Sequence, residues 1–417
     1  MSDHFSRGRP IVVALLMGVM VISVLDKSIF AFAGPQIIDG LQLTPQQFGF
    51  VGSAFYFLYS LSGLVVGFAA NRWASRWILS GMSLVWMLAQ LLTAWSQGFT
   101  ALVCSRMLLG VGCGPGTAVT QHACFKWYLP RERVRPAALI QVAIMLGAVV
   151  GALTLPLAIQ HLGWRHAYML LACVGLAWLL LWQWKGREGP HDDGTTEGAG
   201  GTARYRQLLG DRSFAFVTLA AFCSYLPTAL IYSWVPVYLQ KGLGMAPLQS
   251  GYVVMAATIG VILLNLAVST LSQRAMQRGA SVRRAMVWPP MLACLLGGVA
   301  TGAMGVAGLE RTPLLALFIV GSMLTNLLPA FANSIVAFIA PARQRGSMLA
   351  IHIGVMTSAG MLAPPVVGLA IAHQGGQIAA GFQFAVACFG MALALALASL
   401  LGLALIDPER SRRLLAR

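Results

Sequence analysis

Charged residues are scarce in this chain of 417 residues. Asp, Glu, Lys and Arg together make up 10% of it, against about a quarter in a typical soluble domain. Hydrophobic residues make up 58%, and apolar stretches long enough to cross a bilayer, about 20 residues each, recur along the whole sequence. The composition therefore excludes an ordinary soluble domain. It predicts an all-α membrane protein, in which each helix satisfies its own backbone hydrogen bonds.

Recognisable catalytic and metal-binding patterns are lacking as well. The seven cysteines lie in or beside apolar runs, and no two of them have the CxxC spacing. We therefore predict neither disulfides nor a zinc site. Because no nucleophile–base set is evident either, we expect that the chain is not an enzyme and needs no cofactor or metal.

Acidic residues are the rarer charges, with 12 Asp and Glu against 28 Lys and Arg, a net charge of +16. The bases lie between apolar runs rather than on one soluble face, so we expect no nucleic-acid partner. Twelve transmembrane spans are predicted, at 11–33, 46–70, 77–96, 99–127, 136–160, 164–185, 213–239, 248–272, 285–306, 313–340, 346–373 and 378–406. An even number places both termini on one side, and 23 of the 28 bases lie on that side. This asymmetry predicts a multi-pass protein of the cell (inner) membrane with both termini in the cytoplasm.

The longest polar stretch, residues 186–212, is rich in glycine and predicts a cytoplasmic linker. It separates residues 1–185 from residues 213–417, with six predicted spans on each side. Arg72 after the second span corresponds to Arg274 after the eighth, 202 residues later. This near-repeat predicts two pseudo-symmetric six-helix bundles, a common transporter plan with the substrate site between the halves.

The loop after the second span resembles the signature of the major facilitator superfamily, Gly-x-x-x-Asp-Arg-x-Gly-x-Arg-Arg/Lys. The matching positions here are Gly67, Asn71, Arg72, Ala74, Arg76 and Trp77. Asn71 replaces the acid of the motif, so the resemblance implies a weakened cytoplasmic gate. Arg131, Glu132 and Arg133, in "YLPRERVR", belong to the corresponding loop after the fourth span.

A more specific resemblance is to the anion:cation symporter branch of that superfamily. Asp26-Lys27 matches an Asp-Arg pair in the first helix, and "RMLLGVGCGPG", which begins at Arg106, matches the fourth helix except that Cys113 replaces a glutamate. The resemblance implies a symporter in the lipid bilayer that imports a small organic anion, such as an aldonate or hexuronate, with a proton. We expect the protein to be a monomer. Import of aromatic or dicarboxylic acids and export of drugs or metabolites remain alternatives.

Away from the ends of the predicted spans, three charges lie inside the membrane: the acid Asp26 and the bases Lys27 and Arg106. Each costs about 2.5–3.5 kcal/mol at a helix centre, so each needs a polar partner. One acid cannot neutralise two bases, and an anionic substrate would supply the missing charge. We therefore predict that Asp26 carries the proton and that Lys27 and Arg106 bind the substrate. A purely structural salt-bridge network is the alternative.

Six other polar or aromatic side chains in the spans are further substrate-binding candidates. They are Tyr59, Tyr232, Asn326, Asn333, His352 and Ser358. Packing is the alternative for the tyrosines, and a satisfied hydrogen bond between helices is the alternative for His352. The glycine-rich "GVGCGPG" lacks the lysine of a phosphate loop, so helix packing explains it better.

Overall fold

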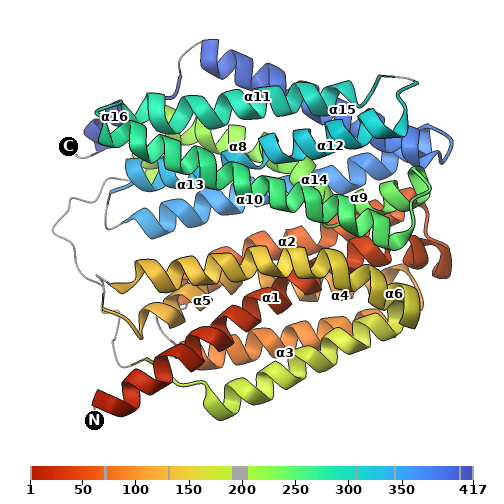
Figure 1. Cartoon of the computed structure of the whole chain (residues 1–417), viewed down its shortest axis with the longest axis horizontal. Coiled ribbons are helices and arrows are strands. Elements are labelled where there is room, and N and C mark those ends of the chain that lie inside the picture. Colours follow the sequence, from red (N-terminus) through yellow and green to blue (C-terminus); the bar gives the residue numbers. More distant parts are fainter. Residues whose placement is uncertain are drawn as a thin grey trace. The chain divides into compact units, whose positions relative to one another are not determined.

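The computed structural model describes residues 2–69, 73–129, 132–189, 205–306, 308–341, 344–402 and 405–415. Every regular element in these ranges is a helix (Figure 1). Ten helices in these ranges are long and apolar enough to cross a membrane. The all-α membrane fold is thus confirmed, whereas the count of twelve spans stays a prediction. Predicted spans 136–160 and 164–185 both fall in one helix that is interrupted at Gly163, where φ is 77°.

The chain forms two compact units, residues 1–196 with 246–255, and residues 197–245 with 256–417. Most of the predicted linker, residues 190–204, lies outside the described ranges. The division at 186–212 therefore stays a prediction.

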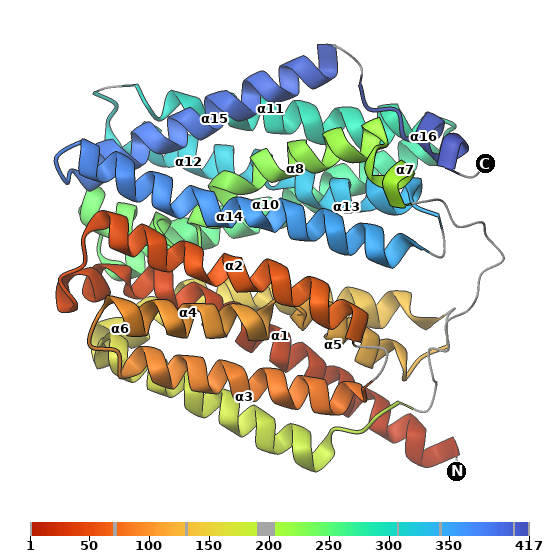
Figure 2. The same cartoon turned by 180° about the vertical axis from the view of Figure 1, so that it is seen from behind.

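The helices of the first unit are α1 (Ser2–Gly40), α2 (Pro45–Ala69), α3 (Ser75–Ala94), α4 (Phe99–Cys113), α5 (Gly116–Phe125) and α6 (Val134–Lys185). Helix α1 packs on α6, α2 packs on α4, and α3 contacts both α4 and α6 (Figure 2). The glycine-rich segment of α4 permits this packing. A Cβ at Gly110 would overlap the Phe55 carbonyl of α2, and one at Gly112 would overlap Trp86 of α3. Close helix packing is therefore the role of these glycines.

The elements of the second unit are α7 (Tyr205–Leu209), α8 (Arg212–Leu230), α9 (Val235–Val237), a π-helical turn (Tyr238–Gly242), α10 (Pro247–Gln277), a second π-helical turn (Arg283–Val287), α11 (Trp288–Ala303), α12 (Arg311–Thr325), α13 (Leu327–Ile339), α14 (Arg345–His373), α15 (Ile378–Gly402) and α16 (Pro408–Leu415). The first turns of α10 belong to the first unit. Side chains such as Met291, Ile335, Met348 and Leu397 form a buried core between α11, α13, α14 and α15.

Local geometry repeats between the two parts of the sequence. Gln42 before α2 and Gly244 before α10 both have positive φ, 49° and 65°, and lie 202 residues apart. At the start of α2 the Thr44 amide donates to Gln47, and at the start of α10 the Ala246 amide donates to Gln249. The same helix-start geometry thus occurs twice at the predicted offset of 202 residues, as an internal duplication leaves it.

Candidate functional site

The buried charges of the first unit are brought together by α1, α3 and α4. Asp26 is 1% exposed, and its Oδ1 accepts a hydrogen bond from Gln90 Nε2 of α3 at 2.6 Å. Gln90 is itself 1% exposed. The hydrogen-bond partner of the buried carboxylate is therefore a neutral amide, a residue that the sequence analysis did not select.

Arg106 lies in the interior of the first unit, with 1% of its surface exposed. Its guanidinium carbon is 4.4 Å from the ring centroid of Phe30 and 4.9 Å from that of Phe55. Each cation–π contact contributes up to about 2 kcal/mol in a desolvated position. Yet Nε and Nη1 of Arg106 have no hydrogen-bond partner among the described residues. The charge is thus held by aromatic faces, while two of its donors remain unsatisfied.

Lys27 points to a different neighbour from Asp26, as adjacent positions on a helix do. Its Nζ lies 5.7 Å from the ring centroid of Tyr59 on α2, and both side chains are half-buried. This places the predicted candidate Tyr59 beside the predicted base Lys27.

Cys113 lies within electrostatic reach of all three charges, Asp26, Lys27 and Arg106. The Ser23 hydroxyl is 4.0 Å from the Cys113 sulfur. Helix α4 ends at Cys113 and α5 begins at Gly116, so the thiol lies where the fourth predicted span is broken. The structure therefore groups the three charges around Cys113, the position at which the sequence resemblance leads us to expect a glutamate.

Other buried polar atoms around this group also lack partners among the described residues. They are the hydroxyl of Tyr168 on α6 and Oε1 of Gln90. Tyr168 is 1% exposed and interacts electrostatically with Arg106 and Asp26. Buried polar groups are usually satisfied, and each exception requires an explanation. A carboxylate together with a hydroxyl-bearing ligand could satisfy these donors and acceptors.

Replacing Gln90 tests whether this amide sets the proton affinity of Asp26. In Gln90→Leu the carboxylate loses a hydrogen bond, so the protonated form is favoured at higher pH. A hydrogen bond to a charged group contributes about 1.5–3 kcal/mol. We expect the midpoint of the pH dependence of transport to move about 1 unit toward higher pH.

The control for this prediction is Thr93→Val, one turn further along α3. Thr93 is buried and donates only to the Ala89 carbonyl of its own helix, at 2.8 Å. Its replacement should leave the midpoint in place. An unchanged midpoint in a folded Gln90→Leu protein would contradict the role of Gln90.

Two of the candidates of the second unit, His352 and Ser358, have hydrogen-bond partners within that unit. His352 is fully buried, and its Nδ1 lies 2.8 Å from the Thr218 hydroxyl of α8, whereas Nε2 has no partner in the described part of the chain. The Ser358 hydroxyl donates to the Val355 carbonyl of its own helix. Tyr232 lies half-buried in the turn between α8 and α9. Binding roles for these three residues stay predictions.

Asn326 lies where the tenth predicted span is broken, between α12 and α13, and its Nδ2 donates to the Ser322 carbonyl at 2.9 Å. The Ser224 hydroxyl of α8 donates to the adjacent Thr325 carbonyl. This break is 212 residues beyond the break at Gly114 in the first unit. Asn333 lies in α13, so the two asparagines do not share one continuous helix, and its Oδ1 is buried without a partner in the described ranges.

The predicted gating residues are only partly described, because Asn71, Arg72 and Arg131 lie outside the described ranges. Arg76 donates to the Gln183 carbonyl at the end of α6 at 2.7 Å. Glu132 is 4.0 Å from Arg9, and Arg133 Nε donates to the Tyr128 carbonyl. These contacts tie the ends of neighbouring helices together.

Glu188, just beyond the end of α6, is a residue that the sequence analysis left in the loop. Its carboxylate accepts hydrogen bonds from the backbone N–H groups of Ser75 and Arg76, both at 3.0 Å, and from Lys126 Nζ at 2.6 Å. A carboxylate at a helix N-terminus satisfies otherwise unpaired amides and the helix dipole. Glu188 thus joins the start of α3 to the end of α5. The start of α3 directly follows the loop in which Asn71 replaces the acid of the motif.

Glu188→Gln should lower the free energy of unfolding at neutral pH by about 1 kcal/mol. This value is smaller than for a fully buried carboxylate, because solvent screens the partly exposed Glu188. Partial burial raises the pKa of Glu188, but the hydrogen bonds from Lys126, Arg76 and Ser75 outweigh burial and place the pKa below its ordinary value. A carboxylate whose pKa is lowered by folding stabilises the protein at pH values above its unfolded-state pKa. This stabilisation is lost as the pH falls through its folded-state pKa.

Thermal unfolding in detergent measures this effect. The difference between wild type and Glu188→Gln should be present at pH 7 and disappear at pH values below the ordinary range of a glutamate. Glu132→Gln, at an exposed ion pair, should have little effect at either pH. A difference that persists unchanged in acid would contradict the electrostatic role.

In the described ranges, no group of three or more His, Cys, Asp or Glu side chains could hold a metal ion.

Comparison with known proteins identifies the family. A family model described as Major Facilitator Superfamily matches residues 16–304. The hexuronate transporter of Bacillus subtilis is 28% identical over 178 residues, 43% of this chain and 42% of that protein. The probable sulfoacetate transporter SauU of Cupriavidus necator is 27% identical over 298 residues, covering 64% of this chain and 68% of that protein. The probable galactarate/D-glucarate transporter GudP of Escherichia coli is 22% identical over 305 residues, 66% of this chain and 68% of that protein.

Solved structures share the fold over nearly the whole chain. A bacterial homologue of the human lysosomal transporter Spinster superposes with a TM-score of 0.77 at 16% identity and covers 98% of both chains. A D-xylose-proton symporter superposes with a TM-score of 0.73 at 13% identity, covering 96% of this chain and 98% of the other. The predicted superfamily is confirmed. The relatives named for anions agree with the predicted anion:cation symporter branch, although this chain spans less than half of the hexuronate transporter.

Proposed function

Since the chain belongs to the Major Facilitator Superfamily, we propose that it imports a small organic anion, a sugar acid such as an aldonate or hexuronate, together with a proton. The observation that carries this proposal is Arg106, a fully buried cation whose Nε and Nη1 have no hydrogen-bond partner among the described residues. An arginine can donate two parallel hydrogen bonds to a carboxylate. Lys27 adds a second positive charge in the same group.

The names of the relatives support an anionic substrate. They include transporters of hexuronate, of sulfoacetate and of galactarate or D-glucarate, all carboxylates or sulfonates. Exporters of cationic drugs instead favour surplus acids in the cavity, which makes drug export the weaker alternative. An aromatic acid is a second candidate for import, because Tyr56 and Tyr59 lie next to Phe55, close to the buried charges.

Coupling follows from competition between two negative charges for the same bases. When Asp26 is protonated, Lys27 and Arg106 attract the substrate carboxylate without a competing anion. After access changes to the cytoplasmic side, loss of the proton restores the charge of Asp26 and weakens substrate binding. A monoanion with one proton crosses without net charge, so the membrane potential, worth about 2.3 kcal/mol per charge per 100 mV, does not drive it.

The proton-to-substrate stoichiometry tests this mechanism. Because Cys113 stands where related symporters carry a glutamate, we expect a value near one in proteoliposomes. Cys113→Glu places a second carboxylate within reach of Lys27 and Arg106 and should raise the value toward two. A wild-type value near two, or uptake that is insensitive to an imposed pH gradient, would contradict the mechanism.

The proposal extends to location and assembly. The side of the membrane that carries most of the bases is proposed to be the cytoplasm, with the protein in the inner membrane as a monomer. One carboxylate is a poor cage for sodium, so a proton is the proposed coupling ion.

A further inference from the structure

Helix α11 carries a stripe of exposed apolar side chains. Trp288, Leu292, Leu296 and Val299 are 38%, 43%, 60% and 58% exposed. Spacings of four, four and three residues place them on one face of the helix. At 1.5 Å per residue this stripe is about 16 Å long, roughly half the thickness of the hydrocarbon core. The stripe therefore has the length of the acyl region of one leaflet.

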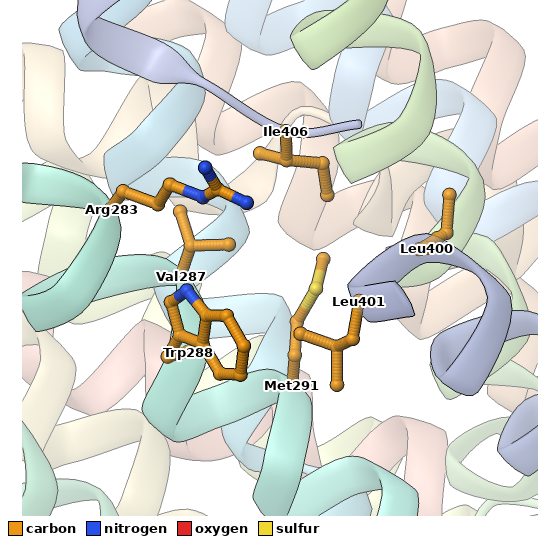
Figure 3. Close-up of a pocket in the computed structure, with 7 residues that line it drawn as sticks. All are labelled: Arg283, Val287, Trp288, Met291, Leu400, Leu401 and Ile406. Atoms are coloured by element: carbon orange, nitrogen blue, oxygen red, sulfur yellow. The ribbon is translucent and has the colours of Figure 1, made fainter. Parts of the chain in front are cut away.

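A small cavity lies at the N-terminal end of this stripe. It is lined by Arg283, Val287, Trp288, Met291, Leu400, Leu401 and Ile406 (Figure 3). Figure 3 shows the Arg283 guanidinium above Val287, pointing toward Ile406 across the cavity. Among the side chains that line it, the Arg283 guanidinium and the indole N–H of Trp288 are the polar groups.

Arg283 is half-buried, and none of the salt bridges or side-chain hydrogen bonds found in the described ranges includes its guanidinium. None of the described residues that line the cavity carries a carboxylate. Glu409 of α16, an acid held against this turn, accepts a hydrogen bond from the Val282 amide at 2.8 Å. Arg284 on the turn and Arg412 on α16 are exposed. Arg283, Arg284 and Arg412 outnumber the nearby acids Asp407 and Glu409, so the surroundings of the cavity carry a net positive charge beside an apolar stripe.

We propose that this cavity and stripe bind an anionic phospholipid. The headgroup phosphate accepts hydrogen bonds from Arg283, and Arg284 adds attraction from outside the cavity. The acyl chain lies along Trp288, Leu292 and Leu296. Basic pockets at the ends of membrane helices suit anionic headgroups. A free phosphate ion would find one guanidinium and an otherwise apolar wall, so the acyl chain is what makes a lipid the better occupant.

The probe is fluorescence quenching of Trp288 by brominated lipids in vesicles of phosphatidylcholine with phosphatidylglycerol. Emission from Trp288 is the difference between the wild-type protein and Trp288→Phe. Wild type should prefer brominated phosphatidylglycerol over brominated phosphatidylcholine. Arg283→Gln should reduce this preference about fivefold, as expected for one basic side chain near an anionic surface.

The matched control is Arg278→Gln, an exposed arginine at the end of α10 that does not line the cavity. It should leave the preference unchanged. If Arg283→Gln does not fold, Leu401→Phe fills the cavity while keeping the charge, and it should reduce the preference as well. Three results would each overturn the proposal. They are equal affinity of the wild type for both lipids, an equal loss of the phosphatidylglycerol preference in Arg278→Gln and Arg283→Gln, and displacement of the lipid by inorganic phosphate.

Discussion

Asp26→Asn should abolish uptake driven by a pH gradient while substrate counterflow continues at close to the wild-type rate. Accumulation against a gradient requires a group that binds and releases a proton, and Asp26 is the carboxylate buried among the bases of the candidate site. Asparagine has nearly the same shape, and its Oδ1 can still accept the hydrogen bond from Gln90. The replacement therefore removes the proton site with little change in packing.

Two measurements on the same proteoliposomes separate coupling from binding. Uptake under an imposed pH gradient reports coupling, and exchange of labelled for unlabelled substrate at equal pH reports binding and the change of access. Asp39→Asn, which alters an exposed acid at the end of the same helix, should affect neither. Survival of gradient-driven accumulation in Asp26→Asn, or loss of exchange as well as accumulation, would contradict the assignment.

Arg106→Lys should weaken substrate binding by about 10- to 100-fold although the charge is kept. Lysine cannot donate two parallel hydrogen bonds to a carboxylate, and charge-assisted hydrogen bonds contribute about 1.5–3 kcal/mol. The ammonium would still occupy the space between Phe30 and Phe55, so the loss would fall mainly on the ligand. The measurement is the Kd for substrate, from the thermal stabilisation of the purified protein.

Arg165→Lys is the matched control for this change. Arg165 also lies over an aromatic ring, with its guanidinium carbon 4.1 Å from the Trp164 ring centroid, and it donates to the Ser96 carbonyl. It belongs to the same unit but is not among the buried charges, so its replacement should leave the Kd unchanged. A Kd in Arg106→Lys within twofold of wild type would show that the guanidinium does not bind the substrate.

Much of the candidate site of the first unit could be predicted from the sequence, because a charge inside an apolar span is conspicuous and costly. Asp26, Lys27 and Arg106 stand out for this reason, and the structure places all three around Cys113. Gln90 could not be selected in this way, since an uncharged amide in an apolar span is common and its partner lies on another helix. A systematic search for lone amides and hydroxyls in predicted spans would have found it.

The polar contacts at the helix ends that carry most of the bases were harder to predict. Glu188 looks like an ordinary acid at the start of a polar loop, and only three-dimensional proximity shows that it binds the start of α3 and Lys126. The breaks at Gly114 and Asn326 were also missed, because apolar residues continue on both sides and leave the hydropathy pattern uninterrupted. Gly114 and Asn326 themselves keep near-helical dihedral angles, so each break is slight. The boundaries of apolar spans therefore follow from composition, whereas interruptions and polar contacts depend on tertiary packing.

Ligand-induced stabilisation of the purified wild-type protein tests the charge argument most directly. The panel pairs each carboxylate with its neutral and amino analogues, for example galacturonate with galactose and galactosamine. We predict that at least one carboxylate raises the Tm, while its neutral and cationic analogues do not. At a ligand concentration of 100 times the Kd, the gain in the free energy of unfolding should be about 2.7 kcal/mol. Stabilisation by the neutral or cationic members alone would contradict the account.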